Sequence, residues 1–96
     1  MIEVRKTEVF ERWFTGLRDR SAVARIKSRI DRLQLGLLGD ARFVGEGVSE
    51  MRIDYGPGYR VYFAKRGTKA LILLAGGDKR TQSRDIEKAI ELARML

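Results

Sequence analysis

The segment MRIDYGPGYRVYF, from Met51 to Phe63, predicts two short β-strands joined by a tight turn. On each side of the central GPG, apolar or aromatic residues alternate with polar ones. Because successive side chains of a strand point to opposite faces, each strand has one face suited to a core and one that is charged or aromatic. The segment therefore predicts an antiparallel hairpin.

Three side chains of this hairpin share the face opposite its apolar residues: Arg52, Arg60 and Tyr62. We expect Pro57 and Gly58 at the two central positions of the turn, because proline presets φ and glycine tolerates a positive φ. The turn then makes the three side chains neighbours across the two strands. We expect them to point outward together, on the side of the sheet away from the helices.

Periodicity predicts helices and further strands on both sides of the hairpin. The last strand, ALILLA, is apolar on both faces, so we expect it to be the most buried strand, at the centre of the sheet. Helices are expected from Thr7, from Asp19 or Ser21, and from about Gln82 to Arg94; strands are expected at residues 2–4, Phe43–Val44, Val48–Tyr55, Tyr59–Lys65 and Ala70–Ala75.

This order of elements predicts an α+β fold. We expect a small, mostly antiparallel sheet with the two N-terminal helices packed on one face and a C-terminal helix, the other face being partly open. The 96 residues, 44% of them hydrophobic, suit one domain with a single core, expected to span residues 1–96.

The composition excludes several kinds of chemistry. There is no cysteine and no histidine, which removes disulfides, thiol nucleophiles, Ser-His triads and the usual zinc ligands. A metal would rest on carboxylates alone, and no tight carboxylate cluster is present, so we expect neither a metal nor a cofactor.

The charge balance favours a polyanionic partner. Twenty Lys and Arg residues against thirteen Asp and Glu give a net charge of +7, which suits nucleic acid, an acidic protein or a membrane surface, although a merely solvated basic surface explains the charge equally well. No window approaches the ~20 apolar residues of a membrane span, and no signal peptide is visible. We expect a cytoplasmic protein that does not contact membranes.

Two segments give the chain a family resemblance. SEMRIDYGPGYRVYF and LLAGGDKRTQSRDIEKA, together with the order of elements, resemble the RelE/ParE superfamily of toxins from type II toxin–antitoxin modules. The resemblance covers nearly the whole chain and is greatest to the HigB-like, phage Gp49-like addiction module killer branch. It implies a RelE-like fold and a toxin neutralised by a cognate antitoxin, in this branch usually a helix-turn-helix DNA-binding protein.

The resemblance also implies an activity and a set of residues. RelE-like members enter the ribosomal A site and cut the mRNA held there, whereas ParE-like members share the fold but inhibit DNA gyrase. The basic residues of RelE-like nucleases correspond to Arg52 and Arg60 on the strands and to Lys79 and Arg80 after the last strand. The chain departs from RelE at Asp54, which replaces a second basic residue, and in the final helix, where the catalytic tyrosine is absent near Asp85.

Cleavage of RNA by its own 2′-hydroxyl sets the chemical requirements. The nucleophile must be held in line, its proton taken up, the phosphate charge stabilised and the leaving 5′ oxygen assisted. Arginine suits the phosphate because its guanidinium is always charged and grips two oxygens, so we assign Arg52 and Arg60 to the scissile phosphate and Arg80 as a third contact. A lysine can move a proton when neighbouring like charges lower its pKa. Lys79 is the best placed for that role.

Other roles remain open at this point. Asp54 and Asp85 are alternative carboxylate bases, Tyr62 offers a surface for stacking a base, and Lys65 is a further candidate contact to RNA. Each candidate also has a structural explanation. Arg52 could pair with Asp54 or Glu50, Tyr62 could pack against a neighbour, and Asp85 could stabilise the start of the last helix. The arginines of the second helix, Arg25, Arg29 and Arg32, are expected on a solvated face.

The leading hypothesis is therefore a metal-independent mRNA endoribonuclease whose partners are an antitoxin, the ribosome and mRNA. The alternative is a non-catalytic, ParE-like inhibitor of DNA gyrase, which the absent tyrosine and Asp54 favour. A nucleic-acid-binding module without a toxin role is a third hypothesis. It leaves the GPG hairpin and the GGDKRTQ segment unexplained.

Overall fold

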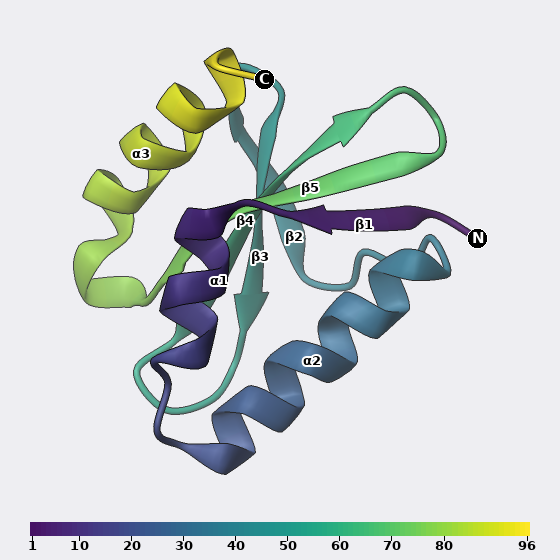
Figure 1. The fold of residues 1–96 in the computed structure, drawn as a ribbon. Coiled ribbons are helices and arrows are strands. Elements are labelled where there is room, and N and C mark those ends of the chain that lie inside the picture. The colour runs from purple at the N-terminus through teal and green to yellow at the C-terminus, as the bar shows by residue number, and fades with distance from the viewer.

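The computed structural model describes residues 1–96 (Figure 1). It contains five strands, three α-helices and a short 3-10 helix. In chain order these are β1 (Glu3–Lys6), α1 (Glu8–Thr15), α2 (Arg20–Gln34), β2 (Ala41–Gly45), β3 (Val48–Ile53), β4 (Tyr59–Arg66), β5 (Ala70–Gly77), η1 (Lys79–Thr81) and α3 (Gln82–Arg94). The α+β class and the element order expected from the sequence are confirmed.

Side-chain caps start the first two helices where the sequence predicts them. The Thr7 hydroxyl accepts a hydrogen bond from the Phe10 amide at 3.1 Å, and it donates one to the Leu74 carbonyl at 2.6 Å. The Asp19 carboxylate accepts hydrogen bonds from the Ser21 and Ala22 amides. Each cap satisfies amides that the first turn of a helix leaves unpaired.

The sheet is mixed, in the order β1-β5-β4-β3-β2. The β2–β3, β3–β4 and β4–β5 pairs are antiparallel, and β1 pairs with β5 in parallel. The central strand is therefore β4. The expectation that Ala70–Ala75 forms the centre is wrong by one position, because β1 adds only one strand beyond β5. Burial on both faces of β5 is nevertheless confirmed.

The hairpin between β3 and β4 turns one residue earlier than expected. The Gly58 amide donates to the Tyr55 carbonyl at 3.1 Å, which places Gly56 and Pro57 at the centre of the turn. Gly56 has φ 57° and Gly58 has φ 78°, so two glycines rather than one supply the left-handed backbone. The strands thus end at Ile53 and restart at Tyr59.

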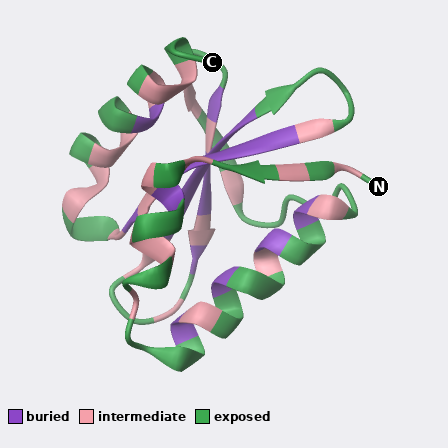
Figure 2. Ribbon diagram, in the orientation of Figure 1, coloured by how far each residue is buried: buried purple, intermediate pink, exposed green.

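Helices cover both faces of the sheet. α1 and α2 pack on one face over a core that includes Phe10, Met51 and Phe63, whereas α3 packs on the other face over Tyr62 and Leu74 (Figures 1 and 2). The expected open face is therefore wrong over β4 and β5, because α3 folds back onto these strands. The face remains open beside β2 and β3, where the Arg42 and Arg52 side chains are 53% and 43% exposed.

A bulge in β5 prepares the end of the sheet for close packing. The register shifts between Tyr62 and Phe63, so that Leu74 and Ala75 both belong to the core under α3. Beyond the bulge, a Cβ on Gly76 would overlap the indole ring of Trp13, and one on Gly77 would overlap the Asp85 carboxylate. Glycine at both positions lets a helix approach each face of the strand.

None of the helices has the length and apolar character required to cross a membrane.

Candidate functional site

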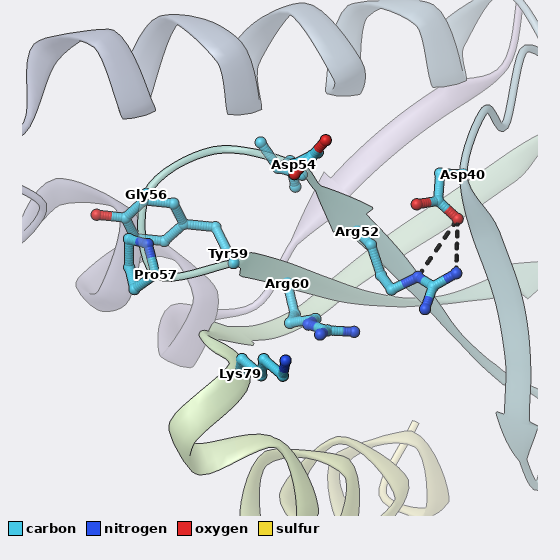
Figure 3. Close-up of a pocket in the computed structure, with 10 residues that line it drawn as sticks. Asp40, Arg52, Asp54, Gly56, Pro57, Tyr59, Arg60 and Lys79 are labelled. Carbon is cyan, nitrogen blue, oxygen red and sulfur yellow. Dashed lines mark hydrogen bonds and ion pairs between the residues drawn. The ribbon is translucent and has the colours of Figure 1, made fainter.

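An open cleft of about 520 Å³ lies where the β3–β4 hairpin meets the segment after β5. The hairpin turn and that segment are joined by a 3.4 Å hydrogen bond from the Lys79 amide to the Pro57 carbonyl. The cleft brings together three of the predicted cations, as Figure 3 shows. It is lined by Asp40, Arg52, Ile53, Asp54, Gly56, Pro57, Gly58, Tyr59, Arg60 and Lys79.

The two strand arginines lie opposite each other. Arg52 of β3 and Arg60 of β4 are register partners, so their side chains leave the sheet on the same face. Figure 3 draws the Lys79 side chain alongside that of Arg60, on the side nearer to α3. The hairpin and the start of η1 therefore place Arg52, Arg60 and Lys79 around one cleft, as the sequence predicts.

Arg52 is paired with a carboxylate that the sequence analysis did not consider. Its Nη2 lies 3.0 Å from Asp40 Oδ1 and its Nε lies 3.3 Å from the same oxygen. The backbone supports this pair, because the Arg52 amide donates to the Asp40 carbonyl at 2.9 Å. Asp54 and Glu50, the expected partners, do not pair with Arg52. Asp40 immediately precedes β2, which pairs with β3, so local sequence spacing does not reveal this contact.

Glu50 is a buried carboxylate that contacts the guanidinium of Arg60, and its relative exposure is 0%. Its Oε1 accepts hydrogen bonds from Arg42 Nε and Arg60 Nη1, both at 3.2 Å. Its Oε2 accepts from the Tyr62 hydroxyl at 3.0 Å and from Gln82 Nε2 at 2.9 Å. Four donors from β2, β4 and α3 therefore converge on one charge. We call Glu50 with these four donors the Glu50 cluster.

The cluster determines the ionisation of its members. Burial alone would raise the pKa of Glu50, but hydrogen bonds from Gln82, Tyr62 and Arg42, with the charge of Arg60, hold that pKa below its usual value. Burial and the adjacent Glu50 charge raise the pKa of the Tyr62 phenol. Glu50 is therefore ionised and Tyr62 neutral at physiological pH.

Tyr62 is not a stacking surface. Its relative exposure is 0%, and it lies in the core beneath α3. The expectation of an outward-facing tyrosine is wrong because it rested on an open sheet face, which α3 instead covers. Arg60 is also largely buried, with a side chain only 10% exposed, although it still lines the cleft.

Two other predicted residues, Arg80 and Asp85, lie outside the cleft lining. Arg80 pairs with Asp78 at 2.9 Å, and its side chain is 80% exposed, outside the cleft lining. A hydrogen bond from Arg80 lowers the pKa of Asp78. Asp85 lies in the first turn of α3 against Gly77 and accepts a hydrogen bond from the Thr81 hydroxyl. Asp85 thus stabilises the start of the helix rather than facing the cleft.

Lys65 is also remote. It lies near the far end of β4, five residues from Arg60, which corresponds to roughly 16 Å along a strand. It lines a different hollow, together with Ile2 and Leu38. The structure therefore does not bring Lys65 into the site.

Arg29 of α2 supports the cleft instead of lying on a solvated face. Arg29 donates to the carbonyls of Arg52 at 2.6 Å and Asp40 at 3.3 Å, and burial lowers the pKa of its guanidinium. Arg25 lies 4.6 Å from the ring centre of Tyr55. Arg25 and Arg32 are both exposed, so the prediction of a solvated face is confirmed for these two and wrong for Arg29.

The cations of the cleft differ in how far they are neutralised. Arg52 is paired with Asp40 and Arg60 with Glu50, whereas Lys79 forms no ion pair. Asp54 lies exposed on the hairpin side of the cleft and also lacks an ion-pair partner. The arrangement can bind an anion between guanidinium groups, with one amine and one carboxylate available to move a proton.

Comparison with known proteins decides the family. The family model described as "Phage derived protein Gp49-like (DUF891)" matches residues 12–96. The chain belongs to the Gp49-like family. A protein of Haemophilus influenzae, described only as an uncharacterized protein, is 45% identical over 95 residues, covering 99% of this chain and 96% of that protein.

The Gp49-like family is a RelE/ParE-like toxin family associated with toxin–antitoxin modules. Membership therefore implies a cognate antitoxin as partner. The fold of this Gp49-like protein, with its mixed sheet and C-terminal helix, is compatible with a RelE-like fold.

Sequence reasoning missed Asp40 and considered Glu50 only as a partner of Arg52, whereas Glu50 pairs with Arg60 in this Gp49-like protein. For Glu50 a signal existed: it alternates with Arg52 on β3 and lies opposite Tyr62, on the face that the hairpin pattern assigns to Arg60. For Asp40 no local signal existed, because the pair depends on where β2 begins.

Proposed function

We propose that this protein is a HigB-like toxin that cuts mRNA on the ribosome without a metal ion. One observation carries the proposal: Arg52, Arg60 and Lys79, from separate parts of the chain, line a single cleft. An open cleft with three cations suits a phosphodiester with its two neighbouring nucleotides. The family supports a toxin, and toxins of this kind are often ribonucleases.

In this proposal the arginines stabilise the reacting phosphate. The two residues are cross-strand partners on one face of the hairpin, and charge develops on the phosphate oxygens as the 2′-hydroxyl attacks. Lys79 and Asp54 are the two groups able to move protons, one toward the leaving 5′ oxygen and one from the 2′-hydroxyl. The RNA fragment upstream of the cut would end in a 2′,3′-cyclic phosphate, and the downstream fragment would begin with a 5′-hydroxyl.

The ribosome would supply the alignment that the protein lacks. The chain contains no histidine, and no tyrosine occupies α3, so its own proton-transfer groups are weak. Holding the nucleophile in line can itself account for ~7–11 kcal/mol of a barrier. A codon held in the A site is already ordered, which explains why a simple cationic cleft in a cytoplasmic protein suffices.

The antitoxin would neutralise the toxin by covering the cleft. The family implies such a partner, and we propose a helix-turn-helix DNA-binding type that presents carboxylates to Arg52 and Arg60. Because Asp40 already occupies Arg52, an antitoxin carboxylate would replace an existing ion pair there.

A second candidate function is inhibition of DNA gyrase without catalysis. The pairing of both arginines favours it, because a paired guanidinium binds substrate phosphate less strongly than a free one. In that case the cleft would be a protein-binding surface. The two functions leave different damage in the cell, so a single experiment separates them.

The test is 5′-end mapping of cellular mRNA within minutes of inducing the protein, beside Arg60→Ala and Arg66→Ala. Arg66 lies on the same strand at its exposed end, where its side chain donates a hydrogen bond to the Ala93 carbonyl. We expect new 5′ ends inside translated codons for the wild type and Arg66→Ala, and none for Arg60→Ala. Intact mRNA with arrested growth and DNA damage would overturn the nuclease and support the gyrase inhibitor.

A further inference from the structure

Only one nitrogen of the Arg60 guanidinium has a hydrogen-bond partner in the chain. Its Nη1 donates to Glu50 Oε1, whereas its Nε is buried and has no hydrogen-bond partner, and Nη2 has none within the chain. In a guanidinium, the Nε–H and the adjacent Nη2–H point the same way and form a fork that matches two oxygens of a phosphate. Buried donors without a partner are rare in folded proteins. Of this pair, Nε is closed to solvent, so Nη2 is the unpaired donor that an acceptor from outside the chain can reach.

Glu50 is held much more firmly than Arg60. Both of its oxygens are saturated, each by two donors, and these donors come from three different elements of the fold. A buried carboxylate with so many partners is fixed in place, because moving it would leave several groups unsatisfied. It is therefore a rigid anchor for the Arg60 guanidinium bound to it.

We propose that Glu50 is the positioning residue of the cleft: by fixing Nη1, it orients the Arg60 guanidinium so that the unpaired Nη2 receives the phosphate of an RNA substrate. This inference rests on the proposed function for its substrate, although the orientation of Arg60 stands apart from it. Glu50 acts through Arg60 and does not touch the substrate.

The charge of Glu50 has a second consequence for binding. It reduces the attraction of Arg60 for any anion, so that affinity is lowered while orientation is gained. Replacing it with an uncharged residue therefore separates the two effects. Binding of RNA is retained or strengthened, and the chemical step is slowed.

The first measurement is single-turnover cleavage of mRNA on programmed ribosomes by the wild type, Glu50→Gln and Glu46→Gln. Glu46 is the matched control, because it is also paired with an arginine, Arg94 at 2.6 Å. It lies between β2 and β3, beside the last residue of α3, whereas Glu50 contacts Gln82 at the first residue of that helix. Both variants remove one negative charge. We expect Glu50→Gln to lower the saturating rate by at least about 100-fold with no weaker half-saturation, as misplacement of a reacting group does.

A double variant asks whether Glu50 works through Arg60. If it does, Glu50→Gln adds no further loss to Arg60→Ala, because the oriented group is already gone. A cleavage rate for folded Glu50→Gln equal to that of Glu46→Gln would overturn the proposal. So would losses that multiply in the double variant.

A second readout does not depend on nuclease activity. Rotation about the Arg60 Nε–Cζ bond, measured by nitrogen NMR of the guanidinium, is expected to be slow in the wild type and fast in Glu50→Gln. If the wild type cuts no mRNA, the proposed function fails, and this rotation still decides whether Glu50 orients Arg60. Unchanged rotation would overturn the positioning role.

Should Glu50→Gln not fold, Glu50→Asp replaces it in both measurements. That variant keeps the buried charge and withdraws the carboxylate by one methylene. We expect it to fold and to lose part of the saturating rate, with faster rotation of Arg60. Wild-type rate and wild-type rotation together would overturn the proposal.

Discussion

Arg60→Ala removes one of the four donors that hold the buried Glu50 carboxylate, whereas Arg52→Ala removes one partner of a half-exposed ion pair. Each variant lowers the net charge by one, so the comparison cancels the effect of overall charge. A buried hydrogen bond to a charged group contributes about 1.5–3 kcal/mol to stability. An exposed ion pair contributes about 0–1 kcal/mol. Arg60→Ala should therefore be less stable than Arg52→Ala by roughly 0.5–3 kcal/mol.

The Glu50 cluster limits the stability that Arg60→Ala can lose. Removing the only partner of a buried charge costs about 3–5 kcal/mol, but Glu50 keeps three donors after Arg60 is lost. Removing Arg60 also removes its unpartnered buried Nε, which recovers part of the loss. A protein of this size should remain folded at 25 °C.

The assay is urea unfolding of both variants at pH 7 with thermal melting as a second probe. With a urea slope of about 1–3 kcal/mol/M, Arg60→Ala should unfold at roughly 1 M lower urea than Arg52→Ala. Its melting temperature should be lower by roughly 5–20 °C, from about 4–8 °C per kcal/mol. Equal midpoints for the two variants would refute the conclusion that Arg60 balances a buried charge.

Three further outcomes are expected. The difference in unfolding free energy between the wild type and Glu50→Gln should be greatest near pH 6 and shrink as the pH falls below about 4.3, because a carboxylate with a lowered pKa contributes stability that is lost on protonation. Urea midpoints across pH 3–7 measure this, and a constant difference would contradict it. Gly76→Ala should cost about 1–3 kcal/mol through overlap with the Trp13 indole, and combining it with Trp13→Ala should cost less than the sum; additive losses in urea unfolding would exclude that contact. Arg29→Ala should cost roughly 1–2 kcal/mol and speed hydrogen exchange of the Arg52 amide, which donates to the Asp40 carbonyl; unchanged exchange would separate Arg29 from the cleft.

Local periodicity is enough to predict most elements of this fold. The helices at Thr7, Asp19 and Gln82 and the β3–β4 hairpin each depend on spacing within a few residues, and each begins within a few residues of its expected position. The layer formed by α3 was not predictable in the same way. Its apolar face suits packing on either side of the sheet, and only the path of the chain after the β5 bulge selects the side.

Three cations of the site were predictable, whereas of its two carboxylates only Glu50 left a signal in the sequence, through its alternation with Arg52. Arg52, Arg60 and Lys79 follow from the hairpin and the family resemblance, and the structure brings them together. Their pairing depends on Asp40 and Glu50, whose partners lie 12 and 10 residues away along the chain. Spacing within a single strand does not reveal such pairs. Burial of Tyr62 was missed for the same reason, since it results from contact between β4 and a helix formed at the end of the chain.

The parallel pairing of β1 with β5 bears on the order in which the chain can fold during synthesis. Glu3 pairs with Ala70, so the first strand finds its partner only after 67 further residues have been added. At about 5–20 residues per second, the ribosome therefore releases α1 and α2 seconds before the sheet that covers their apolar faces can be completed. Pairing between strands so far apart in the sequence is slow, because the entropy of closing the loop is lost before any strand contact offsets it. The newborn protein consequently acquires its cleft late, when nearly all of its chain has left the ribosome that made it.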